Sequence, residues 1–289
     1  MAEVIAVDWG LTSFRAWRLA SDGTVQDSVS GPFGIRALAD RDFATVLDRA
    51  VGVWRPAPVL MCGMIGSRQG WVEAPYVAAP AGLAAIAAAL APVPGIDRVW
   101  IVPGVSQDPP DVMRGEETQI VGVAGTLGPG RHVLCLPGTH SKWAVVEDGQ
   151  VAGFRTAMTG ELFGLMRAQS ILAPLIPEDA GDDAAAFEAG VARAREEGGL
   201  LHHLFGLRAG VLLGRLAPAA LPSMLSGLLI GHEIAGLAAE AREVHLVGSA
   251  ALTGHYARAL ARFGIAATTH GEEAAAHGLF AIAREAGIA

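Results

Sequence analysis

One pattern of local structure occurs twice in this chain of 289 residues. In each copy an apolar, β-branched strand ends in a polar loop with Gly, and a second strand, an Asp-Gly turn and a third strand follow. Gly10–Ser13 aligns with Gly138–Ser141, and Asp22-Gly23 aligns with Asp148-Gly149. Asp-Gly between alternating strands is typical of a tight hairpin. The pattern therefore predicts two related halves, each built around a sheet.

Helical patterns between and after these strands predict the fold class. Apolar residues recur at helical spacing over 40–54, 80–91, 116–125, 160–241 and 272–287. Strands alternating with helices indicate α/β sheets in both halves. We place the boundary near 126–131, so that the N-terminal domain is 1–128 and the C-terminal domain is 129–289.

Composition excludes several classes of partner. The formal net charge is −8 without a basic cluster, so neither nucleic acid nor an anionic membrane surface is an expected partner. Cys62 and Cys135 lie in apolar strands and are expected to be buried free thiols of a reducing compartment. The longest apolar run, Gly82–Val93, is too short to span a bilayer. With no signal-peptide pattern at the N-terminus, we expect a cytoplasmic protein.

The first polar loop, in DWGLTSFR, has the residues of a phosphate site. Asp8 ends a buried strand, and Gly10, Thr12 and Ser13 follow in a tight turn. Backbone N–H groups and hydroxyls in such a turn cradle phosphate oxygens, and the carboxylate can hold hydrated Mg²⁺. A hairpin with polar turn residues explains the same letters equally well.

The second polar loop, in LPGTHSKW, holds the only lysine among 21 Lys and Arg residues. Gly138 permits close backbone approach, Thr139, His140 and Ser141 are polar, and Lys142 adds a compact, movable charge that Arg does not supply. The alternative is a surface position that retained Lys by chance. Two such loops facing each other would hold the two ends of a polyphosphate.

Two further segments carry candidate functional residues. In VGSAAL, Gly248 and Ser249 open a helix, where N–H groups admit a flat ring or a phosphate; a plain strand–helix turn is the alternative. In MRGEETQ, Glu116 and Glu117 begin a helix. Carboxylates there complement the helix dipole, and one of them can instead serve as general base for a substrate hydroxyl.

Other polar pairs lack the spacing of a metal site. His202-His203 and His232-Glu233 lie in predicted helices and are interpreted as packed or surface residues. Glu272-Glu273 is interpreted as the first turn of the last helix.

Taken in order, these segments resemble the actin-like ATPase superfamily, which includes the sugar kinases. DWGLTSFR resembles its first phosphate motif, LPGTHSKW its second, and VHLVGSAAL its adenosine motif. Four strings narrow the resemblance to the 2-dehydro-3-deoxygalactonokinase family: 63–76, 110–119, 136–143 and 156–163. Leu11 and Phe14 depart from the family pattern, which removes one candidate phosphate hydroxyl.

The resemblance implies two actin-like (ribonuclease H-like) α/β domains with a cleft between them. It also implies ATP- and Mg²⁺-dependent phosphorylation of the terminal (C6) hydroxyl of 2-dehydro-3-deoxy-D-galactonate, in galactonate breakdown. ATP would bind mainly to the second half, with its phosphates between the two loops. The sugar acid would bind to the first half, and a homodimer is left open.

The resemblance also suggests residue roles. Asp8 would position Mg²⁺ through water, and Glu116 would accept the hydroxyl proton, with Glu117 as second choice. Arginine suits bidentate binding of a carboxylate. The residues expected to bind the sugar acid are Arg15, Arg36, Arg68, Gln69 and Glu161.

Three alternatives stay open at this point. The first is a kinase for another sugar or sugar acid. The second is a non-catalytic sugar-sensing module, which predicts loss of Asp8 or Glu116, although both are present. The third makes Lys142 a Schiff-base residue for pyridoxal phosphate, which a visible absorption band would reveal.

Overall fold

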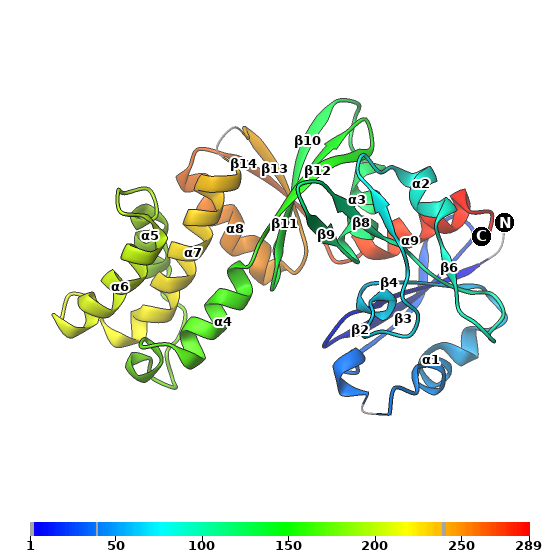
Figure 1. The fold of residues 1–289 in the computed structure, drawn as a ribbon, viewed down its shortest axis with the longest axis horizontal. Coiled ribbons are helices and arrows are strands. Elements are labelled where there is room, and N and C mark those ends of the chain that lie inside the picture. The colour runs from blue at the N-terminus through cyan, green and yellow to red at the C-terminus, as the bar shows by residue number, and fades with distance from the viewer. Residues whose placement is uncertain (1–2, 39, 239–240) are drawn as a thin grey trace. The chain divides into compact units, whose positions relative to one another are not determined.

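The computed structural model describes residues 3–38, 40–238 and 241–289. These residues form α-helices and three β-sheets (Figure 1). Residues 239–240, near the end of the predicted helical stretch 160–241, lie outside the described residues. The mixed α/β content agrees with the predicted class.

Two compact units make up the chain, and they are interleaved in sequence. The first comprises Met1–His132, Ala144–Phe154 and His270–Ala289, and the second comprises Val133–Trp143 and Arg155–Thr269. They therefore do not coincide with the predicted ranges 1–128 and 129–289. The main difference is the C-terminal segment, which packs within the first unit.

The six-stranded sheet of the first unit positions the first polar loop. Its order is β3-β2-β1-β4-β7-β6. The strands are β1 (Val4–Trp9), β2 (Phe14–Leu19), β3 (Val25–Gly31), β4 (Val59–Cys62), β6 (Ala91–Pro92) and β7 (Val99–Ile101). Strand β1 runs antiparallel to β2 and parallel to β4, so Asp8 pairs with Arg15 on one side and with Cys62 on the other.

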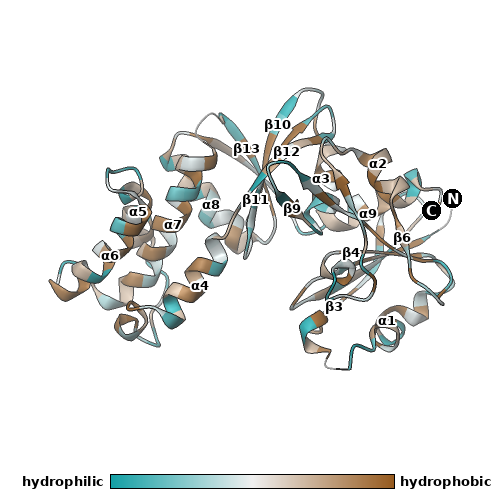
Figure 2. Cartoon of the chain, viewed as in Figure 1, coloured by the Kyte–Doolittle hydropathy of each residue, from teal (hydrophilic) through white to brown (hydrophobic). Residues whose placement is uncertain are grey.

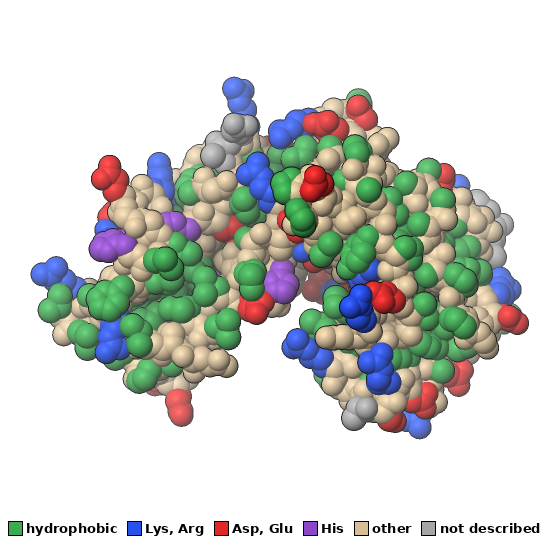
Figure 3. Space-filling model, in the orientation of Figure 1, with side chains coloured by type: hydrophobic (Ala, Val, Ile, Leu, Met, Phe, Trp, Pro, Cys, Tyr) green, Lys and Arg blue, Asp and Glu red, His purple; other side chains and the backbone are tan. Residues whose placement is uncertain are grey.

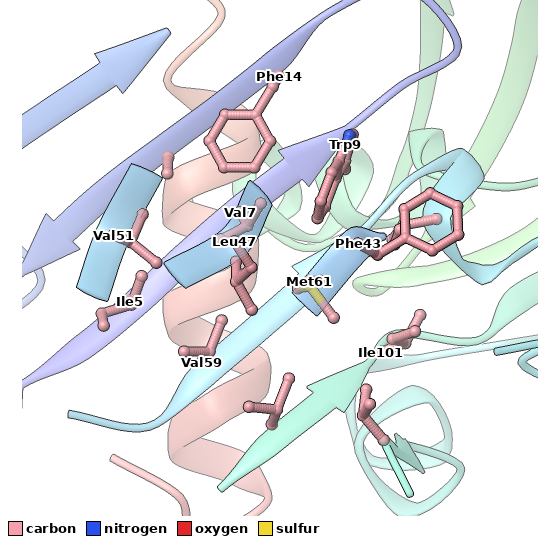
Figure 4. Close-up of a cluster of buried hydrophobic side chains, with 14 of the residues drawn as sticks. Ile5, Val7, Trp9, Phe14, Phe43, Leu47, Val51, Val59, Met61 and Ile101 are labelled. Atoms are coloured by element: carbon pink, nitrogen blue, oxygen red, sulfur yellow. The ribbon is translucent and has the colours of Figure 1, made fainter. Parts of the chain in front are cut away.

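Helices cover both faces of this sheet. Helix α1 (Phe43–Val51) packs its buried side chains on Ile5, Val7 and Met61 (Figure 4). Helix α9 (Ala274–Glu285) packs against β1, β2 and β4, and against α3 (Glu116–Ala124). A Cβ added to Gly278 would lie 1.8 Å from the Thr118 carbonyl oxygen, so this contact requires glycine. Burial of α9 explains why the C-terminus belongs to the first unit.

The segment between β4 and α3 forms a small sheet that the sequence analysis did not predict. Its order is β5-β8-β9, from β5 (Tyr76–Ala78), β8 (Gly104–Gln107) and β9 (Asp111–Met113). The helix expected over 80–91 is shorter, since α2 spans Leu83–Ala88 and β6 follows. Strands this short contain too few residues to show an alternating pattern.

A five-stranded sheet repeats the strand order of the first. Its order is β12-β11-β10-β13-β14, which matches β3-β2-β1-β4-β7. The strands are β10 (Arg131–Leu136), β11 (Ser141–Glu147), β12 (Gln150–Ala157), β13 (Glu243–Val247) and β14 (Ala266–His270). As β1 does with β4, β10 runs parallel to β13. The predicted structural repeat is thus confirmed. Cys62 and Cys135 are buried free thiols, also as predicted.

Helices supply most of the second unit. They are α4 (Thr159–Gln169), α5 (Ala184–Arg193), α6 (Gly199–Leu212), α7 (Leu221–Leu237) and α8 (Ala250–Arg262). Helix α7 is apolar around much of its circumference (Figure 2) because it packs against the other four. By length and composition, Pro218–Leu237 is the one candidate membrane span in the described chain, but it is 61% buried. Its burial marks it as a core helix. Helix α6, in contrast, exposes Leu201 and Phe205 in a region rich in hydrophobic surface (Figure 3).

Candidate active site

Asp8 lies at the end of β1 in an ion-pair chain. Its Oδ2 accepts a hydrogen bond from Nη2 of Arg15 at 2.7 Å, and Nη1 of Arg15 lies 3.0 Å from Oε2 of Glu272. Burial raises the pKa of Asp8 above its ordinary value, and the Arg15 guanidinium partly offsets that effect. Arg15 is therefore engaged by two carboxylates of its own chain, which the sequence analysis did not anticipate.

The loop after Asp8 is a tight turn held by backbone hydrogen bonds. The Gly10 N–H donates to the Ser13 carbonyl at 2.9 Å, and the Gly10 carbonyl accepts from the Ile35 N–H at 3.0 Å. These bonds hold the loop shape, while the side chains of Thr12 and Ser13 are exposed. Exposed hydroxyls on a fixed turn can meet phosphate oxygens. Arg36, just beyond, is also exposed.

Two glycines bring the start of α3 beside Asp8. A Cβ added to Gly63, after β4, would lie 3.2 Å from Oδ1 of Asp8. A Cβ added to Gly115 would lie 3.1 Å from the Gly63 Cα. Both glycines have positive φ, +92° and +109°, which disfavours any other residue. The close approach sets Gly115, which directly precedes Glu116 at the start of α3, against the Gly63 backbone beside Asp8.

The structure separates the roles of the two adjacent glutamates. Glu117 is fully buried, and its carboxylate accepts bonds from the Gly115 N–H at 2.7 Å and from the Thr118 hydroxyl at 3.0 Å. Glu116 is partly exposed, and its Oε2 accepts from the Arg114 N–H at 3.0 Å. A substrate can therefore reach Glu116, whereas Glu117 braces the turn.

Glu117→Gln is expected to stabilise the protein at alkaline pH. Burial, together with the Glu116 charge, raises the pKa of Glu117 to about 7 from 4.5. Between these values the folded state binds more protons than the unfolded state, so this group makes stability fall as pH rises. Above pH 7 the ionised Glu117 lowers the free energy of unfolding by roughly 3 kcal/mol, and the substitution by Gln removes this penalty. Urea unfolding at pH 5 and pH 8 measures the difference in free energy of unfolding between the variant and wild type. The gain in stability of the variant should be larger at pH 8. Equal differences at both pH values would contradict this account.

Other predicted substrate residues lie near the small sheet. Arg68 and Gln69 are exposed, and Arg68 forms a 3.4 Å ion pair with Glu73. Arg68 would have to break this pair in order to bind a substrate carboxylate. The sequence analysis missed Arg114. Its Nη2 donates to the Ala74 carbonyl at 2.8 Å, and its guanidinium lies 4.3 Å from the centroid of the Tyr76 ring. The sequence feature that could have pointed to Arg114 is its position directly before Gly115.

In the second unit, α4 packs onto the second polar loop. The Glu161 N–H donates to the Thr139 carbonyl at 2.9 Å, and a Glu161 carboxylate oxygen lies 2.5 Å from Nε2 of His140. A Cβ added to Gly160 would lie 2.4 Å from the Gly138 carbonyl oxygen. Thr139 and His140 are exposed. Glu161, a predicted substrate residue, thus holds the loop in shape.

Ser141 and Lys142 lie on opposite faces of β11. Ser141 is fully buried, and its Oγ lies 2.8 Å from the hydroxyl of Tyr256. Lys142 is 6% exposed, and its Nζ donates to the Thr156 hydroxyl at 2.9 Å. Successive strand residues alternate faces, so Trp143 shares the face of Ser141. The Ser141 hydroxyl is therefore turned inward, whereas the predicted phosphate contact requires an accessible one.

A cavity of about 290 Å³ lies in the second unit beside the loop. Gly138 and Gly160 line it with residues of α5 and α7, and α8 contributes Leu252, His255 and Tyr256. Gly248, with φ +145°, and the exposed Ser249 directly precede α8. Apolar walls with a few polar groups suit a flat ring. Lys142 is not among the lining residues.

The repeated sheet order, with a Gly loop after the first strand of each sheet, defines the actin-like ATPase fold. A solved structure of the same fold is the activator of 2-hydroxyisocaproyl-CoA dehydratase from Clostridium difficile, determined with bound ADPNP. It is 13% identical to this chain, with a TM-score of 0.54 over 98% of this chain and 95% of that one. At this identity the likeness concerns the fold alone, and it agrees with the predicted class.

Within this class, the chain belongs to the 2-keto-3-deoxy-galactonokinase family, whose sequence model matches residues 8–282. An Escherichia coli K12 protein named 2-dehydro-3-deoxygalactonokinase is 39% identical over 91% of both chains. A Rhizobium meliloti protein named as a probable enzyme of this kind is 44% identical over 96% of both. A crystal structure of a Sinorhizobium meliloti protein of similar description has a TM-score of 0.91 at 43% identity, covering 98% of both chains. The predicted family is confirmed.

Proposed function

We propose that this chain transfers the terminal phosphoryl group of ATP to the C6 hydroxyl of 2-dehydro-3-deoxy-D-galactonate. The observation that carries the proposal is the placement of Glu116, a partly exposed carboxylate that directly follows Gly115, whose backbone approaches the Gly63 segment beside Asp8. The names of the relatives supply the substrate. The partners are small molecules, and we expect the enzyme to work in the cytoplasm, where ATP is available.

Glu116 is proposed to accept the proton of the attacking hydroxyl. The bond from the Arg114 N–H occupies one lobe of its Oε2 and fixes the carboxylate direction. A general base must lie within hydrogen-bond reach of the proton that it removes. Glu117 is too deeply buried for that contact, so its proposed part is to hold the turn from which Glu116 projects.

The nucleotide is proposed to bind through the polar loops and the cavity of the second unit. The cavity takes the base and ribose between α7 and α8. Backbone N–H groups of Gly138 and Thr139, and the exposed hydroxyls of Thr12 and Ser13, are the candidate phosphate ligands. Phosphoryl transfer depends mainly on positioning and charge stabilisation, which such contacts supply.

The residues near Asp8 fit Mg²⁺ held through water. The described residues contain no cluster of three or more His, Cys, Asp or Glu side chains that could hold a metal. Mg²⁺ needs no such cluster, because it keeps several waters and uses one or two carboxylates with substrate phosphates. Asp8 offers one carboxylate whose Oδ1 faces the Gly63 segment. Bound there, the ion would neutralise phosphate charge.

The substrate carboxylate needs an exposed arginine that is not held by two carboxylates of its own chain. Arg15 is held by Asp8 and Glu272, so we propose Arg68 or Arg36 in its place.

A coupled ADP-release assay across 2-keto-3-deoxy acids, aldonic acids and neutral sugars tests the function. We expect turnover with 2-dehydro-3-deoxygalactonate and little with neutral sugars. Preference for a neutral sugar would overturn the proposed substrate.

Lys142→Met is expected to lower kcat/KM by about tenfold to a hundredfold, because a charged hydrogen bond contributes roughly 1.5–3 kcal/mol. Met keeps the bulk of the stem and removes only the charge. Lys142→Arg should not restore activity, since a planar fork needs more room than this buried position gives. Thr156→Val is the matched control and should have a smaller effect.

Steady-state kinetics with each substrate show which ligand Lys142 contacts. If Lys142→Arg had the same kinetic constants as wild type, the activity would not require the compact ammonium group of Lys142. A visible absorption band in the purified protein would instead indicate a pyridoxal Schiff base at Lys142.

A further inference from the structure

Glu233, in the C-terminal half of α7, is a buried carboxylate that accepts hydrogen bonds from two neutral side chains. It is 6% exposed. Its Oε1 accepts from the Trp143 indole N–H at 2.6 Å, and its Oε2 accepts from the Tyr256 hydroxyl at 2.8 Å. No basic side chain in the described chain forms an ion pair with it. Its charge is stabilised by neutral donors instead.

An ionised carboxylate only accepts hydrogen bonds, so it sets the direction of the whole chain of bonds. Tyr256 must donate its proton to Glu233. The Tyr256 oxygen can then only accept from Ser141, whose Oγ lies 2.8 Å away. Burial raises the pKa of Glu233, but hydrogen bonds from Thr159, Trp143, Tyr256 and Ser141 act against that rise.

The groups tied to Glu233 come from three elements, and two of these elements, α4 and α8, line the candidate nucleotide cavity. Ser141 and Trp143 flank Lys142 on β11. Tyr256, on α8, and Thr159, at the start of α4, both line the cavity. Glu233 does not line the cavity, so it can act on a ligand only through these residues. A non-polar residue would pack α7 equally well but would leave the N–H and hydroxyl groups unpaired.

We propose that Glu233 is a positioning residue for the nucleotide: its carboxylate holds β11 and α8 together and orients the Ser141 and Tyr256 hydroxyls behind the cavity. The inference rests on the proposed nucleotide role of that cavity. It assigns a function to a residue that the sequence analysis interpreted as a packed or surface side chain of a helix.

Glu233→Gln is expected to reverse the chain of bonds while keeping the side-chain shape. The indole of Trp143 is a donor only, so the amide oxygen must face it. The amide NH₂ then faces Tyr256, which must turn its proton toward Ser141. Ser141 can then no longer donate to Tyr256 and must accept from it instead. We expect KM for ATP to rise about tenfold or more, with KM for the sugar acid within about twofold of wild type.

The experiment uses the full chain and combines kinetics with nucleotide binding and NMR. Calorimetry with a non-hydrolysable ATP analogue should show the same weakening. Among the indole N–H signals of the six tryptophans, the Trp143 signal, assigned with Trp143→Phe, should move upfield in Glu233→Gln. Tyr256→Phe breaks the same chain at the next bond, so it should also weaken ATP binding. The double variant should lose less than the sum of the single losses.

Glu188→Gln, the same chemical change in the neighbouring helix α5, is the matched control and should leave all three readouts unchanged. An unchanged ATP affinity in both Glu233→Gln and Tyr256→Phe would overturn the inference. Equal increases in KM for ATP and for the acid would also overturn it, because they indicate a general structural role. If wild type binds the ATP analogue but phosphorylates no acid, the proposed substrate fails while the binding test of Glu233 still stands.

Discussion

Replacing Glu116 by Gln is expected to lower kcat by about 10²–10⁴-fold, the usual range for loss of a general base. Gln is nearly isosteric with Glu and can still accept the bond from the Arg114 N–H, so the start of α3 should keep its form. ATP binding should change little, because the base acts on the acceptor hydroxyl. Steady-state kinetics and analogue binding measure the two effects separately.

Glu117→Gln is the matched control for this prediction, since it makes the same change at the next position. It should alter the pH dependence of stability far more than kcat, because its carboxylate is fully buried. A large loss of kcat in Glu117→Gln, together with a small one in Glu116→Gln, would show that the two assignments must be exchanged.

Asp8→Asn is expected to lower kcat on the order of 100-fold at saturating Mg²⁺ without unfolding the chain. Loss of an outer-shell carboxylate typically lowers metal affinity or activity by 10–100-fold, and the reaction depends strongly on charge stabilisation. The amide oxygen of Asn can still accept from Arg15, so one hydrogen bond of the pair survives. Kinetics over a range of Mg²⁺ concentrations test this prediction.

Arg15→Met separates the metal role of Asp8 from its structural ion pair. It removes the guanidinium and leaves the carboxylate in place, so activity should fall less than in Asp8→Asn. If Asp8→Asn retains wild-type kcat at saturating Mg²⁺, Asp8 does not belong to the metal site. If Arg15→Met causes the larger loss, the ion pair with Asp8 and Glu272 is the important element.

Several candidate site residues have contacts that the sequence analysis did not anticipate. Ser141 was expected in the second loop, but it begins β11 and its hydroxyl turns inward to Tyr256. Arg15 was a candidate for the substrate carboxylate, yet Asp8 and Glu272 already bind it. The reason is that the sequence shows which residue types follow a strand, whereas the partner of each side chain comes from segments far away in the chain.

The local order of the elements was determined by the amino-acid sequence alone. Apolar strands, Gly loops and the turns at Asp22-Gly23 and Asp148-Gly149 are short-range features, so their repetition predicted two related halves. The shared strand order of the two sheets was seen only in the structure. The same features predicted which two loops are the candidate phosphate sites, because a tight turn with hydroxyls requires particular residues at neighbouring positions. The family followed from four such strings and was confirmed over 8–282.

Burial and long-range pairing were decided only by the tertiary structure. Glu116 and Glu117 are equivalent in sequence, and only the approach of Gly63 to Gly115 makes one accessible and the other buried. Glu233 and Tyr256 lie on different helices, and they meet Trp143 and Ser141 only when α7 and α8 pack against β11. Helix α9 joins the first unit because Gly278 lets it approach α3. Such contacts depend on the distance between folded elements, which no local pattern of residues encodes.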